Sequence, residues 1–315
     1  MIVSRTRAVA SALIGALAIT LVAAQPSTQP TAYDRQQDAR IAALESQLAG
    51  QPSAIPSPSP SQSSSPSSAA GWTLAFEDTF DRTVALGHLM DGSPDGYHTA
   101  DGRYVVYKSS WTDTSHNGHY DPAIASIANG IFDVHLQWLN GAPHVFAMTA
   151  LPAGSTAKGG LVSMRCEVRI RADRLVGYKG VPMCGWADAA TTNDLLLQYG
   201  ENDFPESNFD QSPAGFMHYT DVQKDAQGKP ICPCQDWYPT GVSWQDWHTY
   251  VVEWRAGQSV EFFVDGRSIG RSTSRIPTVA MHHNEQFETW TNGVLPDPAV
   301  NGHVQIDSIR IWRWA

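Results

Sequence analysis

The stretch that decides the fold is Gly200-Glu201-Asn202-Asp203-Phe204-Pro205-Glu206. It carries three carboxylates within six residues and follows an apolar run, Leu195–Tyr199, that we interpret as a strand. Side chains of a strand alternate between its two faces, so Glu201 and Asp203 are expected to point the same way. Two like charges this close are costly unless one is protonated or a site uses them.

The third carboxylate has the wrong parity for a regular strand. Glu206 is five residues from Glu201, which would place it on the opposite face. One inserted residue, a β-bulge, would return Glu206 to the face of Glu201. Pro205 fits a bulge because proline has no N–H to donate to the hydrogen-bond ladder. We therefore predict a bulge between Asp203 and Glu206, with all three carboxylates facing one cleft. The alternative is a solvated acidic strand end.

Paired carboxyl groups with separated pKa values are what glycoside hydrolysis needs, one as nucleophile and one as general acid. From Gly71 onward the chain resembles glycoside hydrolase family 16, the endo-β-glucanase and laminarinase group. The bulged form of its active-site strand, Gly-Glu-x-Asp-x-x-Glu, matches residues 200–206. Other segments are similar to family strands and keep the family's order: 165–173, 177–186, 215–219, 247–254 and 260–266.

The resemblance implies an all-β, concanavalin-like jelly-roll sandwich of two curved antiparallel sheets with a concave substrate cleft. It also implies a retaining mechanism in which Glu201 is the nucleophile, Glu206 the general acid/base and Asp203 the carboxylate that tunes the nucleophile. Retention requires catalytic carboxyl groups roughly 5–5.5 Å apart. The substrate class implied is a β-1,3- or mixed-linked glucan. A transglycosylase and a carbohydrate-binding protein of the same fold without turnover are the alternatives.

Five further residues are candidates for binding the polysaccharide. The resemblance places Trp186 in the cleft as a stacking platform and His218 near the acid/base; the alternatives are a core tryptophan and an ordinary strand histidine. Strand parity puts Gln286, Glu288 and Trp290 on one face, where they could hold sugar hydroxyls.

One residue departs from the family pattern, which usually has an aliphatic side chain where Asn202 stands. Parity points Asn202 away from the cleft, into the space between the sheets. A buried amide without partners costs about 1–3 kcal/mol. Either Asn202 has hydrogen-bond partners there, or the local geometry differs.

The pattern of the rest of the chain after Gly71 is β-rich, without long helical periodicity, so an all-β sandwich is predicted independently of the resemblance. Asp265-Gly266 between two apolar runs predicts a hairpin turn. The chain has 315 residues, a formal charge of −10 and 17% charged residues, which does not favour nucleic-acid binding.

The first 70 residues are expected to be outside the catalytic domain. Residues 1–24 have the basic start, apolar stretch and small-residue end of a secretory signal peptide, with an uncleaved membrane anchor as the alternative. Residues 25–51 could form a short helix, and the Ser- and Pro-rich residues 52–70 predict a linker to the domain at 71–315. We expect a secreted or cell-surface monomer that meets a membrane only through an uncleaved anchor.

The cysteines and the candidate metal ligands can also be interpreted from the sequence. In an oxidising compartment Cys166, Cys184, Cys232 and Cys234 could form disulfides in three pairings. Cys166 would lie opposite Cys184 if an antiparallel pair turns near residue 175, whereas Cys232 and Cys234 are too close for an easy disulfide with each other and would pair elsewhere or stay free. No cofactor is required by the proposed chemistry. The family implies a structural calcium, for which Glu77 and Asp307 are candidate ligands. The adjacent His282 and His283 should face opposite ways and are not expected to share a metal.

Overall fold

The structure is a computed structural model that describes residues 71–182, 184–189, 198–227, 231, 234–290 and 295–315. The predicted signal peptide at 1–24, the segment 25–51 and the linker 52–70 lie outside the described residues, as do Leu195 to Leu197. Among the described residues, no helix is both long and apolar enough to cross a membrane.

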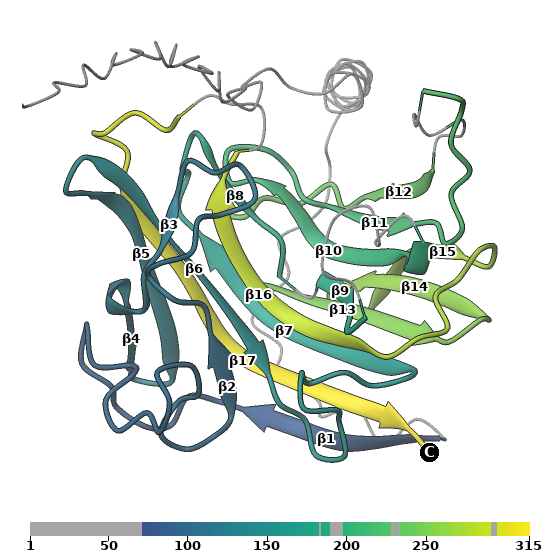
Figure 1. The fold of residues 1–315 in the computed structure, drawn as a ribbon, viewed down its shortest axis with the longest axis horizontal. Helices are drawn as coiled ribbons and strands as arrows, with labels where there is room; N and C mark the ends of the chain where they lie inside the picture. Colours follow the sequence, from purple (N-terminus) through teal and green to yellow (C-terminus); the bar gives the residue numbers. More distant parts are fainter. Residues whose placement is uncertain (1–70, 183, 190–197, 228–230, 232–233, 291–294) are drawn as a thin grey trace, which may run out of the picture.

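The strands form two layers that bend strongly along their length and are joined where residues 137–139 pair with residues 142–144 (Figure 1). We call the first one the β17 sheet. Its order is β4 (Ala125–Ala128), β5 (Ile131–Leu139), β17 (Gly302–Trp314), β7 (Met164–Ala172), β13 (His248–Arg255), β14 (Ser259–Val264) and β15 (Arg267–Ser272), with β1 (Trp72–Asp78) along the last part of β17.

The second sheet, the β16 sheet, carries the acidic motif. It contains β2 (Tyr104–Val106), β6 (Ala142–Ala150), β16 (Met281–Thr289), the short β9 (Cys184–Ala187) and β8 (Tyr178–Gly180), β10 (Glu201–Asn208), β11 (Ala214–His218) and β12 (Gln235–Pro239). A two-residue strand, β3 (His119–Tyr120), pairs with β6 in parallel, and a 3₁₀ turn, η1 (Pro122–Ile124), follows it. The other pairings are antiparallel, which confirms the predicted all-β, jelly-roll-like sandwich.

The core between the sheets fixes which way β10 faces. Phe204 of β10 is fully buried and meets Tyr250 of β13 and Phe262 of β14 edge-on, with ring centroids 5.3 and 5.2 Å apart. Burying a phenylalanine contributes about 1.5–3 kcal/mol. Since this ring is held in the core, the alternate residues of β10 must point out of the sandwich.

Asn202 points to the core side of β10, as parity predicted. It is 1% exposed, and its Nδ2 lies 3.8 Å from the sulfur of Met281 on β16. Gly185 of β9 makes room for the amide, because a Cβ built on Gly185 would lie 2.3 Å from Asn202 Nδ2. A glycine facing the asparagine therefore accommodates this departure from the family pattern.

Two local predictions are wrong. Cys166 is a free, buried thiol on β7, between β13 and β17, whereas β9 with Cys184 lies in the other sheet, so these cysteines do not pair. The chain crosses between the sheets after β7 instead of turning back on itself. Gln198 and Tyr199, the described end of the apolar run, have helical rather than strand backbone.

The predicted late hairpins are confirmed. Strand β13 pairs with β14, and β14 pairs with β15 across the Asp265-Gly266 turn. Both turn residues have positive φ, 49° and 78°, which is the backbone that such a two-residue connection requires.

We expect Gly185→Ala to destabilise the sandwich by about 1–3 kcal/mol, because the added methyl group overpacks the space that Asn202 occupies. Thermal unfolding of the single variants and of the double variant Gly185→Ala/Asn202→Ala checks this. The double variant should lose less stability than the two single losses added together, because it removes the clash. Strict additivity would contradict the proposed contact.

Candidate active site

The predicted bulge is present on β10. Asp203 lies opposite Phe216 of β11, and Glu206 lies opposite Ala214, with the register shift between them. Three steps along β10 therefore match two along β11, and this extra residue restores the parity of Glu206. The bulge contains a cis peptide bond between Phe204 and Pro205.

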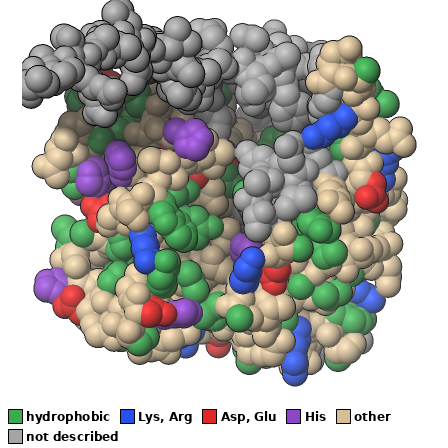
Figure 2. Space-filling view, in the orientation of Figure 1, with side chains coloured by type: hydrophobic (Ala, Val, Ile, Leu, Met, Phe, Trp, Pro, Cys, Tyr) green, Lys and Arg blue, Asp and Glu red, His purple; other side chains and the backbone are tan. Residues whose placement is uncertain are grey.

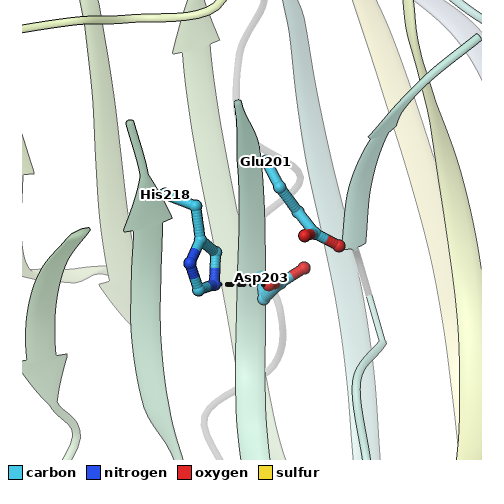
Figure 3. A group of neighbouring side chains, drawn as sticks. All are labelled: Glu201, Asp203 and His218. Carbon is cyan, nitrogen blue, oxygen red and sulfur yellow. Dashed lines mark ion pairs between the residues drawn. The ribbon is translucent and has the colours of Figure 1, made fainter. Parts of the chain in front are cut away.

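Glu201, Asp203 and His218 converge on the outward face of β10 and β11. One ligand atom of each lies within 4.8 Å of the others, and Figure 3 shows both carboxylates pointing to the same side of β10. His218 lies directly across from Glu201, and its Nε2 is 3.0 Å from Oδ2 of Asp203. Asp203 is 4% exposed, so this ion pair is shielded from water.

The charge of His218 is set by these acids. Burial lowers the imidazole pKa, but the hydrogen bond to Asp203 and the negative charges of Asp203, Glu201 and Glu206 outweigh burial and raise it to about 9. At neutral pH the site therefore contains a histidinium ion beside Asp203.

Glu206 meets a second cation, Lys179 of β8. The Lys179 Nζ lies 3.7 Å from Glu206 Oε1 and 3.9 Å from Glu288 Oε2. Burial raises the Glu206 pKa, the Lys179 charge opposes the rise, and the charge of Asp203 adds to it; the net direction is upward. A carboxyl group with a raised pKa next to an acidic neighbour suits a general acid.

Sequence reasoning missed Lys179, although it lies within a segment quoted for the resemblance. The signal that could have found it is a lysine between Tyr178 and Gly180 in an otherwise apolar stretch, close in sequence to the acidic motif. A lysine rarely enters a buried strand without a charged partner.

Glu288 of β16 is fully buried, which does not fit the predicted direct contact with sugar hydroxyls. Its Oε1 accepts hydrogen bonds from the backbone and hydroxyl of Thr114, at 3.2 and 3.0 Å, from Gln286 Nε2 at 2.7 Å and from the Tyr120 hydroxyl. Gln286 shares the face of Glu288, as parity predicted, and is 8% exposed. These hydrogen bonds hold the loop around Thr114 close to Glu288 on β16.

The two tryptophans lie at different places. Trp186 is half-buried and pairs with His282 across β9 and β16. Strand alternation puts its side chain on the side of β9 opposite to Gly185, which meets Asn202, and the ring also packs against the hydrophobic core. Trp290 lies just beyond β16, half-buried, and its backbone N–H donates to the Gly177 carbonyl at 2.9 Å.

The histidines considered as metal ligands each contact a carboxylate. His282 pairs with Asp188 and His283 with Glu285, each at 2.8 Å, on opposite faces as expected. Within the described ranges, Glu201, Asp203 and His218 are the one group spaced like metal ligands, and a metal ion there would have to displace the proton shared between His218 and Asp203.

The calcium expected near Glu77 and Asp307 does not fit these residues. Glu77 pairs with Arg310 at 2.8 Å and Asp307 with Arg169 at 3.3 Å. Each carboxylate is already neutralised by a guanidinium group, whereas a calcium site needs several oxygen ligands free to converge.

Comparisons with known proteins identify the fold. No family model matches the chain, and no curated protein matches its sequence. The laminarinase of Rhodothermus marinus is similar in structure, with a TM-score of 0.57, 19% identity, 78% of this chain and 98% of that chain covered.

Two further structures show the same fold with different named activities. The non-specific endo-β-1,3(4)-glucanase SCLam of family GH16 has a TM-score of 0.58 at 14% identity, covering 78% of this chain and 96% of that chain. Porphyranase B of Zobellia galactanivorans has a TM-score of 0.55 at 14% identity, covering 83% of this chain and 98% of that chain. The chain therefore has the fold of family 16 glycoside hydrolases across most of its length.

We expect NMR titration of the imidazoles to give His218 a pKa of about 9 and Asp203→Asn to lower it. Because the folded-state pKa lies above the unfolded value of about 6.5, the ion pair stabilises the fold fully below that value and is lost as pH rises towards 9. The melting temperature should fall across this window more in the wild type than in His218→Gln. A His218 pKa near 6.5 would contradict the ion pair.

Proposed function

We propose that this chain is a secreted, retaining endo-β-glycanase that hydrolyses β-1,3- or mixed-linked glucan through a glycosyl-enzyme intermediate. The observation that carries the proposal is the bulge on β10, which returns Glu206 to the face of Glu201 and Asp203. An acidic strand end without function gains nothing from this arrangement, because bringing like charges together is unfavourable.

The residues divide the chemistry between them. Glu201 attacks the anomeric carbon while Glu206 donates its proton to the leaving oxygen. In the second step Glu206 takes a proton from water, which releases the sugar from Glu201. Asp203, ion-paired with His218, lies within 4.8 Å of Glu201, so that it contributes to the electrostatic environment of the nucleophile. The two steps need no cofactor.

The substrate class is inferred from the structural neighbours. The SCLam structure is of an endo-β-1,3(4)-glucanase, and LamA of Zobellia galactanivorans was crystallised with laminaritriose and laminaritetraose. The polysaccharide is the partner we propose, with Trp186, His218, Gln286 and Trp290 lining or flanking its path. The basic side chains do not gather into one patch on the face shown in Figure 2.

Secretion is supported by two features. Residues 1–24 have the pattern of a signal peptide, and Cys234 is disulfide-bonded, which is typical of an oxidising compartment. The departure from the family pattern at Asn202 is the one feature that favours the carbohydrate-binding alternative. This asparagine faces the core, and its side chain is directed away from the site.

We expect Glu201→Gln to reduce release of sugars from laminarin and lichenan by at least about a thousandfold, because the amide cannot form the glycosyl-enzyme. Glu261→Gln is the matched control: Glu261 lies on β14 of the β17 sheet, bonds to Ser268 and should leave activity unchanged. Agarose and porphyran complete the panel. Retention of a polysaccharide in affinity gels without release by the wild type would favour the binding protein instead.

The stereochemistry of the product tests the mechanism separately. We expect NMR spectra recorded in the first minutes of hydrolysis to show the β-anomer at the new reducing end, because two inversions restore the configuration. This outcome requires the carboxyl groups of Glu201 and Glu206 to act at roughly 5–5.5 Å. An initial α-anomer would rule out the covalent route.

A further inference from the structure

We propose that Lys179 is a positioning residue that holds the Glu206 carboxyl group and favours its ionised form, so that it serves the second, water-activating step. The inference rests on the proposed function, but the contact between Lys179 and Glu206 can be tested without any turnover.

Lys179 is fixed by its strand neighbours. It pairs directly with Glu288 of β16 on one side and with Asn208 of β10 on the other. Its side chain is 15% exposed, and Nζ lies between the two carboxylates, 3.9 Å from Glu288 Oε2 and 3.7 Å from Glu206 Oε1. The lysine thus links the floor of the site to the proposed acid/base.

Glu288 supplies a rigid anchor for the lysine. All its hydrogen-bond donors, from Thr114, Tyr120 and Gln286, reach Oε1, and Oε2 has no hydrogen-bond partner among the described residues. A fully buried carboxylate needs a compensating charge, and Lys179 faces that oxygen. Because Glu288 cannot move without losing several hydrogen bonds, Lys179 is held in reach of Glu206.

The charges that face Glu206 come from four strands. Asp203 on β10 and Glu288 on β16 disfavour its ionisation, and Lys179 on β8 and His218 on β11 favour it. Lys179 exerts the stronger of these two attractions, and the His218 imidazole is engaged by Asp203 at 3.0 Å. Removal of the lysine leaves the carboxyl group buried among like charges, which favours the neutral form.

The two steps of retention need opposite states of Glu206. In the first step its proton goes to the glycosidic oxygen as the C–O bond breaks and the Glu201–carbon bond forms. In the second step its carboxylate accepts a proton from water as the water–carbon bond forms and the Glu201–carbon bond breaks. A fixed ammonium group at 3.7 Å keeps a larger fraction of Glu206 ionised, which is the form that can accept this proton.

The kinetic test compares Lys179→Met with Lys158→Met in the full-length protein. Lys158 bonds to the Asp188 carbonyl in an exposed loop and is the matched control. The substrate is a dinitrophenyl β-laminaribioside, whose leaving group needs no acid, so that release from Glu201 limits turnover. We expect Lys179→Met to lower kcat about tenfold, with recovery on addition of azide, a nucleophile that needs no base. Lys179→Arg should keep most of the activity.

A second readout does not depend on turnover. In protein labelled with ¹³C-glutamate, assigned with Glu206→Gln, we expect the Glu206 carboxyl to titrate at higher pH in Lys179→Met than in wild type or Lys158→Met. Lys179→Gln replaces the methionine variant if the latter fails to fold. An unchanged Glu206 titration overturns the proposal. A wild type that cleaves no glycoside, with the shift present, overturns the proposed function and leaves the Lys179 contact established.

Discussion

Repulsion among carboxylates is the constraint around which this cleft is organised. Glu201, Asp203, Glu206 and Glu288 lie on two strands of one sheet, and burial in a medium of low polarity strengthens their mutual repulsion. Two cations on neighbouring strands offset this repulsion: His218 pairs with Asp203, and Lys179 lies between Glu206 and Glu288. Each cation is held by strand pairing, so the charge balance depends on the register of the whole sheet.

The side chains on the inward face of β10 also fix the register of this strand. Phe204 anchors the strand against β13 and β14, and Asn202 fills the space left by Gly185. Because strand side chains alternate, a shift of one residue would move Asp203 into the core and Phe204 into the cleft. The apolar core therefore selects the register that turns Glu201 and Asp203 away from the core, and the bulge then adds Glu206 to the same face.

The same arrangement suggests how one carboxyl group can act as acid and then as base. Burial and Asp203 raise the Glu206 pKa, while Lys179 opposes them. Burial and Asp203 alone would favour the protonated acid that the first step needs. Lys179 alone would favour the carboxylate that the second step needs.

The sequence alone predicted features that depend on neighbours along the chain: the alternation of Glu201 and Asp203, the bulge before Glu206, the Asp265-Gly266 turn and the all-β class. The resemblance added the order of the strands. Only the tertiary structure decided that Cys166 is free, that Glu288 is buried and that Lys179 reaches Glu206. These depend on pairing between strands far apart in the chain, such as β8 with β16, and the local periodicity of a strand specifies its faces but not its neighbours.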